Sequence, residues 1–170
     1  WDHGVSPVPG GMSPIDPTAV IRAGAQGGKF WCEVASKVTA ELAASLGWPS
    51  RVVTASRSGY VWEHGVAELW SNQFGKWFVL DTDFNYVFER EGVPLSAFEL
   101  SRDGPLLQKQ GKLTVRRLAP RKPSLPDQDL IPYFAYIHVD LRNDWLSRPL
   151  RPGSPAGGDL STWWTARSTV

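Results

Sequence analysis

Three side chains of this 170-residue chain have the types and the order that nucleophilic catalysis requires. Cys32, the only cysteine, is followed along the chain by His64 and then by Asp81. A thiolate attacks carbonyl carbons, a histidine moves protons near neutral pH, and a carboxylate fixes the tautomer of the histidine. We therefore expect a Cys-His-Asp triad if the fold brings these residues together.

Cys32 lies in the first turn of the clearest helix in the sequence, which we place at residues 30–46. Apolar residues recur there at spacings of three and four and predict one buried stripe, formed by Cys32, Ala35, Val38, Leu42 and Leu46. Gly47 suits the position just after a helix, and Pro49 prevents continuation. A thiol in the first turn experiences the positive end of the helix dipole, which favours the thiolate. The alternative is that Cys32 is only a small apolar member of the stripe.

His64 and Asp81 belong to a predicted hairpin. Its two strands are placed at His64–Trp70 and Trp77–Leu80. If Ser71 pairs with Lys76 across the turn, His64 and Asp81 fall on the same face of the hairpin, one diagonal step apart. Side chains in this arrangement are close enough to contact one another. Taken singly, His64 has the alternative of a core or loop histidine with its hydrogen bonds satisfied, and Asp81 has the alternative of a cap at the end of a strand.

The remaining elements predict an α+β fold. We expect a helical turn after Pro17, and further elements at Arg51–Ala55 (strand), Pro94–Leu100 (short helix), Lys112–Leu118 (strand) and Tyr133–Leu141 (strand). The helix that carries Cys32 should pack on an antiparallel sheet that carries His64 and Asp81. We place a single domain at residues 1–148 and a Pro/Gly-rich tail, with Trp163 and Trp164, at residues 149–170.

Composition excludes several classes of function. Eighteen Lys and Arg against seventeen Asp and Glu leave a net charge of +1, which gives no support to nucleic-acid binding. No apolar run approaches the roughly 20 residues that cross a bilayer. One cysteine and three histidines without ligand spacing predict no metal site, and no nucleotide-binding motif is present. We expect no cofactor. A lone cysteine suits either a reducing or an oxidising compartment, and the sequence leaves localisation and oligomeric state open.

The stretch from Gly27 to Asp83 resembles the core of the transglutaminase-like superfamily. The matching parts are Gly28-Lys29-Phe30-Trp31-Cys32, the helix end Leu46-Gly47 with its following strand, Glu63-His64, and Trp77-Phe78-Val79-Leu80-Asp81. The resemblance implies a papain-like thiol fold, with Cys32 as nucleophile, His64 as base and Asp81 as orienting acid. Members commonly have an aromatic residue two positions after the histidine. This chain has Val66 there, and we expect the cleft wall to differ as a result.

Other residues near the triad are candidates for substrate contacts. An acyl-transfer site needs donors for the developing oxyanion, and the backbone N–H of Cys32 is one by position. Gln26 lies six residues upstream of Cys32, the spacing that papain-like proteases use for a side-chain donor. A polar loop residue is the simpler interpretation of Gln26. Trp31 and Trp62 flank the triad and are expected to line the cleft, with ordinary packing as the alternative.

These features predict thiol-dependent acyl transfer on an amide bond. Hydrolysis of the thioester would make the protein a cysteine peptidase or amidase, whereas attack by an amine would make it a transglutaminase-type transferase. A different class, a non-catalytic binding or scaffold module on the same fold, is the alternative. The expected partner is a peptide or amide-containing substrate, and the nine Trp residues suggest a glycopeptide as one option. Calcium, which the large animal transglutaminases require, has no recognisable loop in the sequence.

Overall fold

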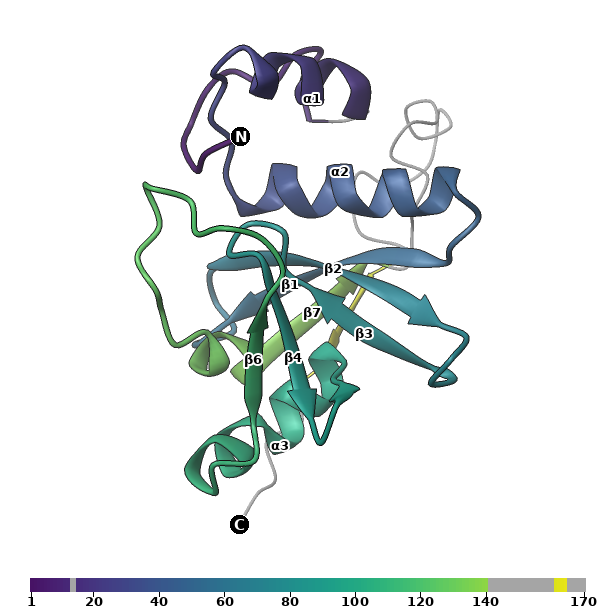
Figure 1. Cartoon of the computed structure of the whole chain (residues 1–170), viewed down its shortest axis with the longest axis vertical. Helices are drawn as coiled ribbons and strands as arrows, with labels where there is room; N and C mark the ends of the chain where they lie inside the picture. The colour runs from purple at the N-terminus through teal and green to yellow at the C-terminus, as the bar shows by residue number, and fades with distance from the viewer. Residues whose placement is uncertain (13–14, 141–160, 165–170) are drawn as a thin grey trace.

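The computed structural model describes residues 1–12, 15–140 and 161–164, and it has an α+β fold (Figure 1). The helices are α1 (Pro17–Ala25), α2 (Cys32–Ser45) and α3 (Ala97–Lys109), with a 3-10 helix at Ile131–Ala135. The strands are β1 (Ser50–Ser56), β2 (His64–Ser71), β3 (Lys76–Leu80), β4 (Tyr86–Arg90), β5 (Val93–Pro94), β6 (Thr114–Arg117), β7 (Tyr136–Asp140) and β8 (Ser161–Trp164).

Two antiparallel sheets organise these elements. The larger has the strand order β3-β2-β1-β7-β8, and the smaller has the order β5-β4-β6. In Figure 1, α2 lies across one face of the larger sheet with α1 beyond it, and the smaller sheet and α3 lie on the other side. The main hydrophobic core fills the space on that other side, with Val53, Val79, Phe88, Leu100 and Phe134 among its buried members.

The ends of α2 follow from local sequence. Gly47 adopts a positive φ of 81°, which glycine tolerates without steric cost. The chain turns back at this glycine and the helix ends. The N–H of Gly47 donates to the carbonyl of Ala44, and the N–H of Trp48 donates to the carbonyl of Ala43. The predicted helix stop is thereby confirmed, and the helix begins at Cys32.

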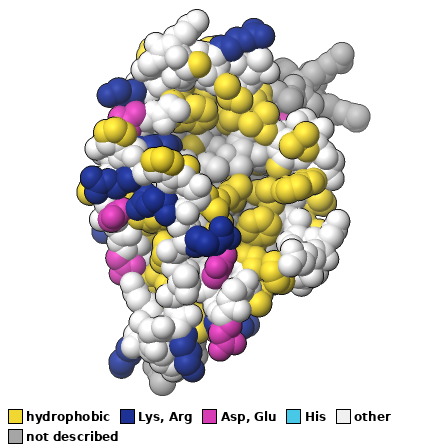
Figure 2. Space-filling view, in the orientation of Figure 1, with side chains coloured by type: hydrophobic (Ala, Val, Ile, Leu, Met, Phe, Trp, Pro, Cys, Tyr) yellow, Lys and Arg dark blue, Asp and Glu magenta, His cyan; other side chains and the backbone are white. Residues whose placement is uncertain are grey.

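The predicted buried stripe of α2 is correct only in its first half. Ala35 and Val38 are buried, but Leu42 is 41% exposed and Leu46 is 76% exposed. Leu42 lines an open hollow with Ile21 of α1 and residues 119–123, and Leu46 is the C-cap residue that follows the helix. On the face drawn in Figure 2, hydrophobic side chains form patches near the top and across the middle of the molecule.

The hairpin has the expected register. Ser71 pairs with Lys76 across the turn, and Ala67 pairs with Leu80 further along the two strands. Strand β1, which was predicted at Arg51–Ala55, pairs with the other side of β2, so that β2 is a central strand of the sheet. At the start of β2, His64 pairs with Ala55 of β1, whereas β3 pairs with β2 only from Ala67 onward.

Later elements differ in extent from the prediction. The helix expected at Pro94–Leu100 begins at Ala97, because Ser96 and Glu99 form a reciprocal capping box, and it continues through Pro105 to Lys109. The strand expected at Tyr133–Leu141 begins at Tyr136. It is preceded by the 3-10 helix, in which Pro132 occupies the first turn. Leu141 lies outside the described residues.

The strand β8 pairs antiparallel with β7 at the edge of the larger sheet. Residues 161–164 therefore belong to the sheet, although the sequence suggested a terminal tail for them; the rest of the expected tail lies outside the described residues. Among the helices that the structure describes, none has the length and apolar character required to cross a bilayer.

Candidate active site

The structure brings Cys32, His64 and Asp81 together. Asp81 directly follows β3, and its Oδ2 atom lies 2.7 Å from Nε2 of His64 at the start of β2. Cys32 is the first residue of α2, and it lies close enough to His64 to contribute to the raised pKa of that histidine. His64 is 5% exposed and Asp81 is fully buried, whereas Cys32 is only partly buried. The pair that would move the proton is thus shielded from water, and the thiol is accessible.

Asp81 is held by its own loop. Its Oδ1 atom accepts hydrogen bonds from the backbone N–H groups of Asp83, at 3.0 Å, and Phe84, at 2.9 Å. Its backbone N–H and carbonyl both pair with Tyr86. Because one carboxylate oxygen is fixed by the loop, the other is directed at His64.

The imidazole of His64 is enclosed by aromatic rings. Phe84 and Tyr133 contact it edge-on, with ring centroids 5.5 and 6.1 Å away. Burial alone would lower the pKa of His64, but the negative charge of Asp81, its hydrogen bond and the contact with Cys32 together raise this pKa to about 10. His64 is therefore an imidazolium at neutral pH.

Gly65 allows the helix to approach His64 closely. A Cβ atom at Gly65 would lie 3.2 Å from Oγ of Ser36 and 3.3 Å from Cα of Glu33, both in the first turns of α2. Such contacts leave almost no room for a side chain. The absence of one lets the start of α2, with Cys32, lie directly over the start of β2.

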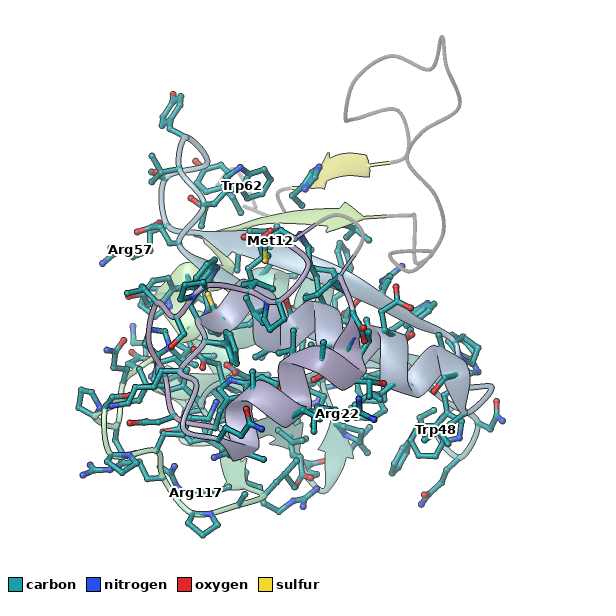
Figure 3. The ribbon with its side chains drawn as sticks, turned by 90° about the horizontal axis from the view of Figure 1, so that it is seen from above. Met12, Arg22, Trp48, Arg57, Trp62 and Arg117 are labelled. Carbon is teal, nitrogen blue, oxygen red and sulfur yellow. The ribbon has the colours of Figure 1, made fainter. Side chains whose placement is uncertain are left out.

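Cys32 and His64 open onto a cavity of about 410 Å³. Its lining consists of Trp31, Cys32, Glu33, Ser36, Lys37, Val52, Thr54, Trp62, Glu63, His64, Gly65 and His138. Trp31 and Trp62 therefore line the cleft as predicted. Trp62 packs on the ring of His138, with centroids 4.7 Å apart, and Figure 3 shows it beside β7 and β8, whereas Trp48 lies at the far end of α2.

The loop that carries Trp62 is held by hydrogen bonds to the side chains of Glu63 and Ser56. The Glu63 carboxylate accepts hydrogen bonds from the backbone N–H of Arg57 at 2.6 Å and from its Nε at 2.7 Å. The Arg57 guanidinium and its backbone N–H accordingly lower the pKa of Glu63. Ser56 Oγ accepts from the N–H groups of Ser58 and Gly59. These bonds give the cleft a fixed wall on this side.

Sequence reasoning missed several lining residues. Ser36 follows Cys32 by four residues, which is one helical turn, and that spacing alone could have indicated it. Glu33 and Lys37, one and five residues after Cys32, also line the cavity but have no such spacing. Lys37 is largely buried and its Nζ donates to Glu33 Oε1 at 2.7 Å. His138 was considered only as a metal ligand. Its place in the cavity depends on the pairing of β7 with β1, for which the sequence carries no local signal.

One expectation about the cleft is wrong. Gln26 does not line the cavity: it is the exposed C-cap residue of α1, and the turn at Gly27, with φ 95°, follows it. Val66 is 1% exposed and belongs to the main core, so its side chain does not line the cavity. The expected difference in the cleft wall, caused by the lack of an aromatic residue at this position, stays a prediction.

A backbone donor for a developing oxyanion is available at the start of α2. The first N–H groups of a helix have no partner within the helix, and Cys32 is the first residue of α2. No group of three or more His, Cys, Asp or Glu side chains in the described part of the chain is arranged to hold a metal ion. The residues that meet at this cavity can therefore supply a nucleophile, a proton carrier and a backbone donor.

Comparisons with protein-family models, with curated proteins and with solved structures returned no match for this chain. The functional argument accordingly rests on the geometry of the site.

Proposed function

We propose that this protein is a cysteine-dependent acyl-transfer enzyme that cleaves amide bonds, with Cys32, His64 and Asp81 as its catalytic residues. The observation that carries the proposal is that Cys32 and His64 line the same open cavity, while the His64 ring is hydrogen-bonded to the buried Asp81 carboxylate behind it. The order of the three residues and the helix–hairpin arrangement also support a transglutaminase-like core.

In the first half-reaction, the Cys32 thiolate attacks the carbonyl carbon of the amide, and a C–S bond forms as the carbonyl oxygen takes up the negative charge. The backbone N–H of Cys32 donates to this oxygen. His64 then gives its proton to the amide nitrogen, the C–N bond breaks, and an amine leaves. A thioester on Cys32 remains. Because Nε2 of His64 is engaged by Asp81, the proton is transferred through Nδ1.

In the second half-reaction, His64 removes a proton from a water molecule, whose oxygen attacks the thioester carbon. The C–S bond breaks, the product is a carboxylic acid, and Cys32 returns to its starting state. A primary amine in place of water would yield a new amide, which is the transferase alternative. Trp31 and Trp62 offer apolar ring faces to the acyl group or the leaving group, and a glycopeptide substrate would also use such faces.

The scaffold alternative predicts binding without turnover. The placement of a buried His64–Asp81 pair and a partly exposed thiol at one cavity argues against it, because a binding module requires no such combination. Partner binding that is unchanged in a Cys32 variant, without any amide turnover by the wild type, would support the scaffold.

The test compares the wild type with Cys32→Ala and Cys32→Ser on a panel of peptide, glycopeptide and simple amide substrates, with and without a primary amine probe. Intact-mass measurement should detect an acyl adduct on the wild type alone, and released acid or incorporated amine should decide between hydrolysis and transfer. Cys32→Ala removes little buried volume and should cost only about 1–2 kcal/mol of stability, so thermal melts should show a folded protein. Undiminished turnover by folded Cys32→Ala would refute the mechanism.

A further inference from the structure

A segment near the beginning of the chain lies against the residues that precede Cys32. We call Asp2–Ser6 the strap. The N–H of Ser6 donates to the carbonyl of Lys29 at 2.8 Å, and the N–H of Phe30 donates to the carbonyl of Asp2 at 3.1 Å. Ser6 Oγ also accepts from the Lys29 N–H at 2.9 Å. The strap therefore fixes the stretch of backbone that leads into the nucleophile.

The same strap reaches the loop that carries the orienting acid. Nδ1 of His3 lies 2.8 Å from Oδ2 of Asp83, and Nζ of Lys122 lies 3.2 Å from Oδ1 of Asp83. The Asp83 side chain is only 1% exposed. The backbone N–H of Asp83 is in turn one of the two that hold Oδ1 of Asp81. Asp83 thus connects the strap to the triad.

The loop is also fixed to the helix of the nucleophile. Thr82 Oγ1 hydrogen-bonds Thr39 Oγ1 at 2.8 Å and donates to the carbonyl of Ala35 at 3.3 Å, and both partners lie in α2. Lys122 donates to the carbonyl of Thr82 at 3.1 Å. The strap, α2 and Lys122 therefore hold one short loop from three directions.

We propose that Asp83 is a positioning residue of the active site, and that His3 and Lys122 act through it to keep Asp81 aligned with His64. A buried carboxylate is costly to hold without hydrogen-bonding or cationic partners, and His3 and Lys122 both contact Asp83. When those partners are removed, Asp83 should turn toward water and withdraw the N–H that fixes Asp81. The inference rests on the proposed function, because it assigns Asp83 a role in that triad.

None of the strap, Asp83 and Lys122 lines the cavity. We call the contacts of His3 and Lys122 with Asp83 the clamp. Loss of the clamp should therefore lower kcat and leave KM nearly unchanged. A displacement of about 1 Å in a catalytic group can cost about 100-fold in rate, and we expect a reduction of roughly 10- to 100-fold in kcat for Asp83→Asn.

The matched control is Glu68→Gln. Glu68 is a second fully buried carboxylate, paired with Arg51 and with the backbone N–H of Ala97, and it makes no contact with the triad that the structure records. Both variants remove one buried charge and should lose comparable stability. Only Asp83→Asn should shift the pH profile of Cys32 alkylation by iodoacetamide toward that of His64→Ala.

Single-partner variants test the clamp itself. His3→Ala and Lys122→Met should each lower kcat, with Arg116→Gln, which breaks the exposed pair with Glu89, as the control. Hydrogen exchange should become faster at the amides of residues 83 and 84 in both clamp variants and remain unchanged in the control.

The outcomes separate this inference from the proposed function. If the wild type turns over no substrate but Asp83→Asn still shifts the alkylation profile, the positioning role stands and the amidase proposal fails. If the wild type is active and folded Asp83→Asn matches Glu68→Gln in kcat, alkylation and hydrogen exchange, the positioning role is refuted and the proposed function remains. A wild-type alkylation profile like that of an unpaired cysteine would refute both.

Discussion

Asp81 divides its two carboxylate oxygens between His64 and its own loop. Oδ2 lies 2.7 Å from Nε2 of His64, and Oδ1 accepts two backbone N–H groups. The loop donates two N–H groups, so an amide at this position could keep both bonds only by turning its oxygen toward the loop and its NH₂ group toward His64. This asymmetry makes the first prediction specific.

In Asp81→Asn, the amide oxygen should occupy the Oδ1 position and the NH₂ group should face His64. Nε2 would then have to accept, which moves the ring proton to Nδ1 and leaves no base for the thiol. We expect kcat to fall by about 10⁴, as the equivalent change does in serine proteases, while the protein stays folded. Nitrogen NMR of His64 should report the changed tautomer. Near-wild-type activity with an unchanged tautomer would contradict this assignment.

Cys32 should react with iodoacetamide well below about pH 8.5, where an ordinary cysteine begins to react, because the His64 imidazolium favours the thiolate. His64→Ala should move the alkylation profile to higher pH. The comparison is made on folded protein, with the rate constant measured across the pH range. Equal rates in the two proteins, or labelling only in denaturant, would indicate that Cys32 is a structural residue.

The His64–Asp81 pair should make stability depend on pH in a defined direction. The pKa of His64 is raised to about 10 in the folded protein by Asp81 and Cys32 despite burial, above the 6.5 of an unperturbed histidine. The folded state thus binds the proton more tightly. The resulting stabilisation is fully present below pH 6.5 and is lost as the pH rises through 10.

Urea unfolding of the wild type and His64→Gln at several pH values across that window measures this effect, since titrations common to both proteins cancel in the difference. The difference in the free energy of unfolding between the wild type and His64→Gln should decrease steadily as the pH rises. A difference that stays constant, or grows, would show that His64 is neutral in the folded protein.

Gly65→Ala should disturb the site through packing alone. The added methyl would lie 3.2 Å from Ser36 Oγ and 3.3 Å from Cα of Glu33, so the first turn of α2 must shift. We expect a loss of about 1–3 kcal/mol in stability, typical of overpacking, together with reduced kcat because Cys32 moves with the turn. Denaturant unfolding and steady-state kinetics measure the two effects. Gly75→Ala is the control, since a Cβ there meets nothing within 4 Å, although its positive φ of 61° adds some strain at a site remote from Cys32.

The sequence alone determined the parts of the site that depend on short-range order. The pattern from Cys32 to Gly47 marked a helix with the cysteine in its first turn, and the turn between Ser71 and Lys76 set the register that places His64 beside Asp81. Both are local, because helix ends and hairpin turns depend on neighbouring residues. The exposure of Leu42 and Leu46 did not follow from the same pattern, since it depends on which distant segments pack beside the helix.

Only the tertiary structure decided how distant segments meet at the site. The pairing of β7 with β1 brings His138 to the cavity, the strap joins His3 to Asp83, and the turn after α1 carries Gln26 away. Periodicity tells which face of an element is buried, but it does not tell which element covers that face. The partners of Cys32 in the triad could be inferred because they lie on one hairpin, whereas the cleft wall and the clamp on Asp83 come from contacts across the whole chain.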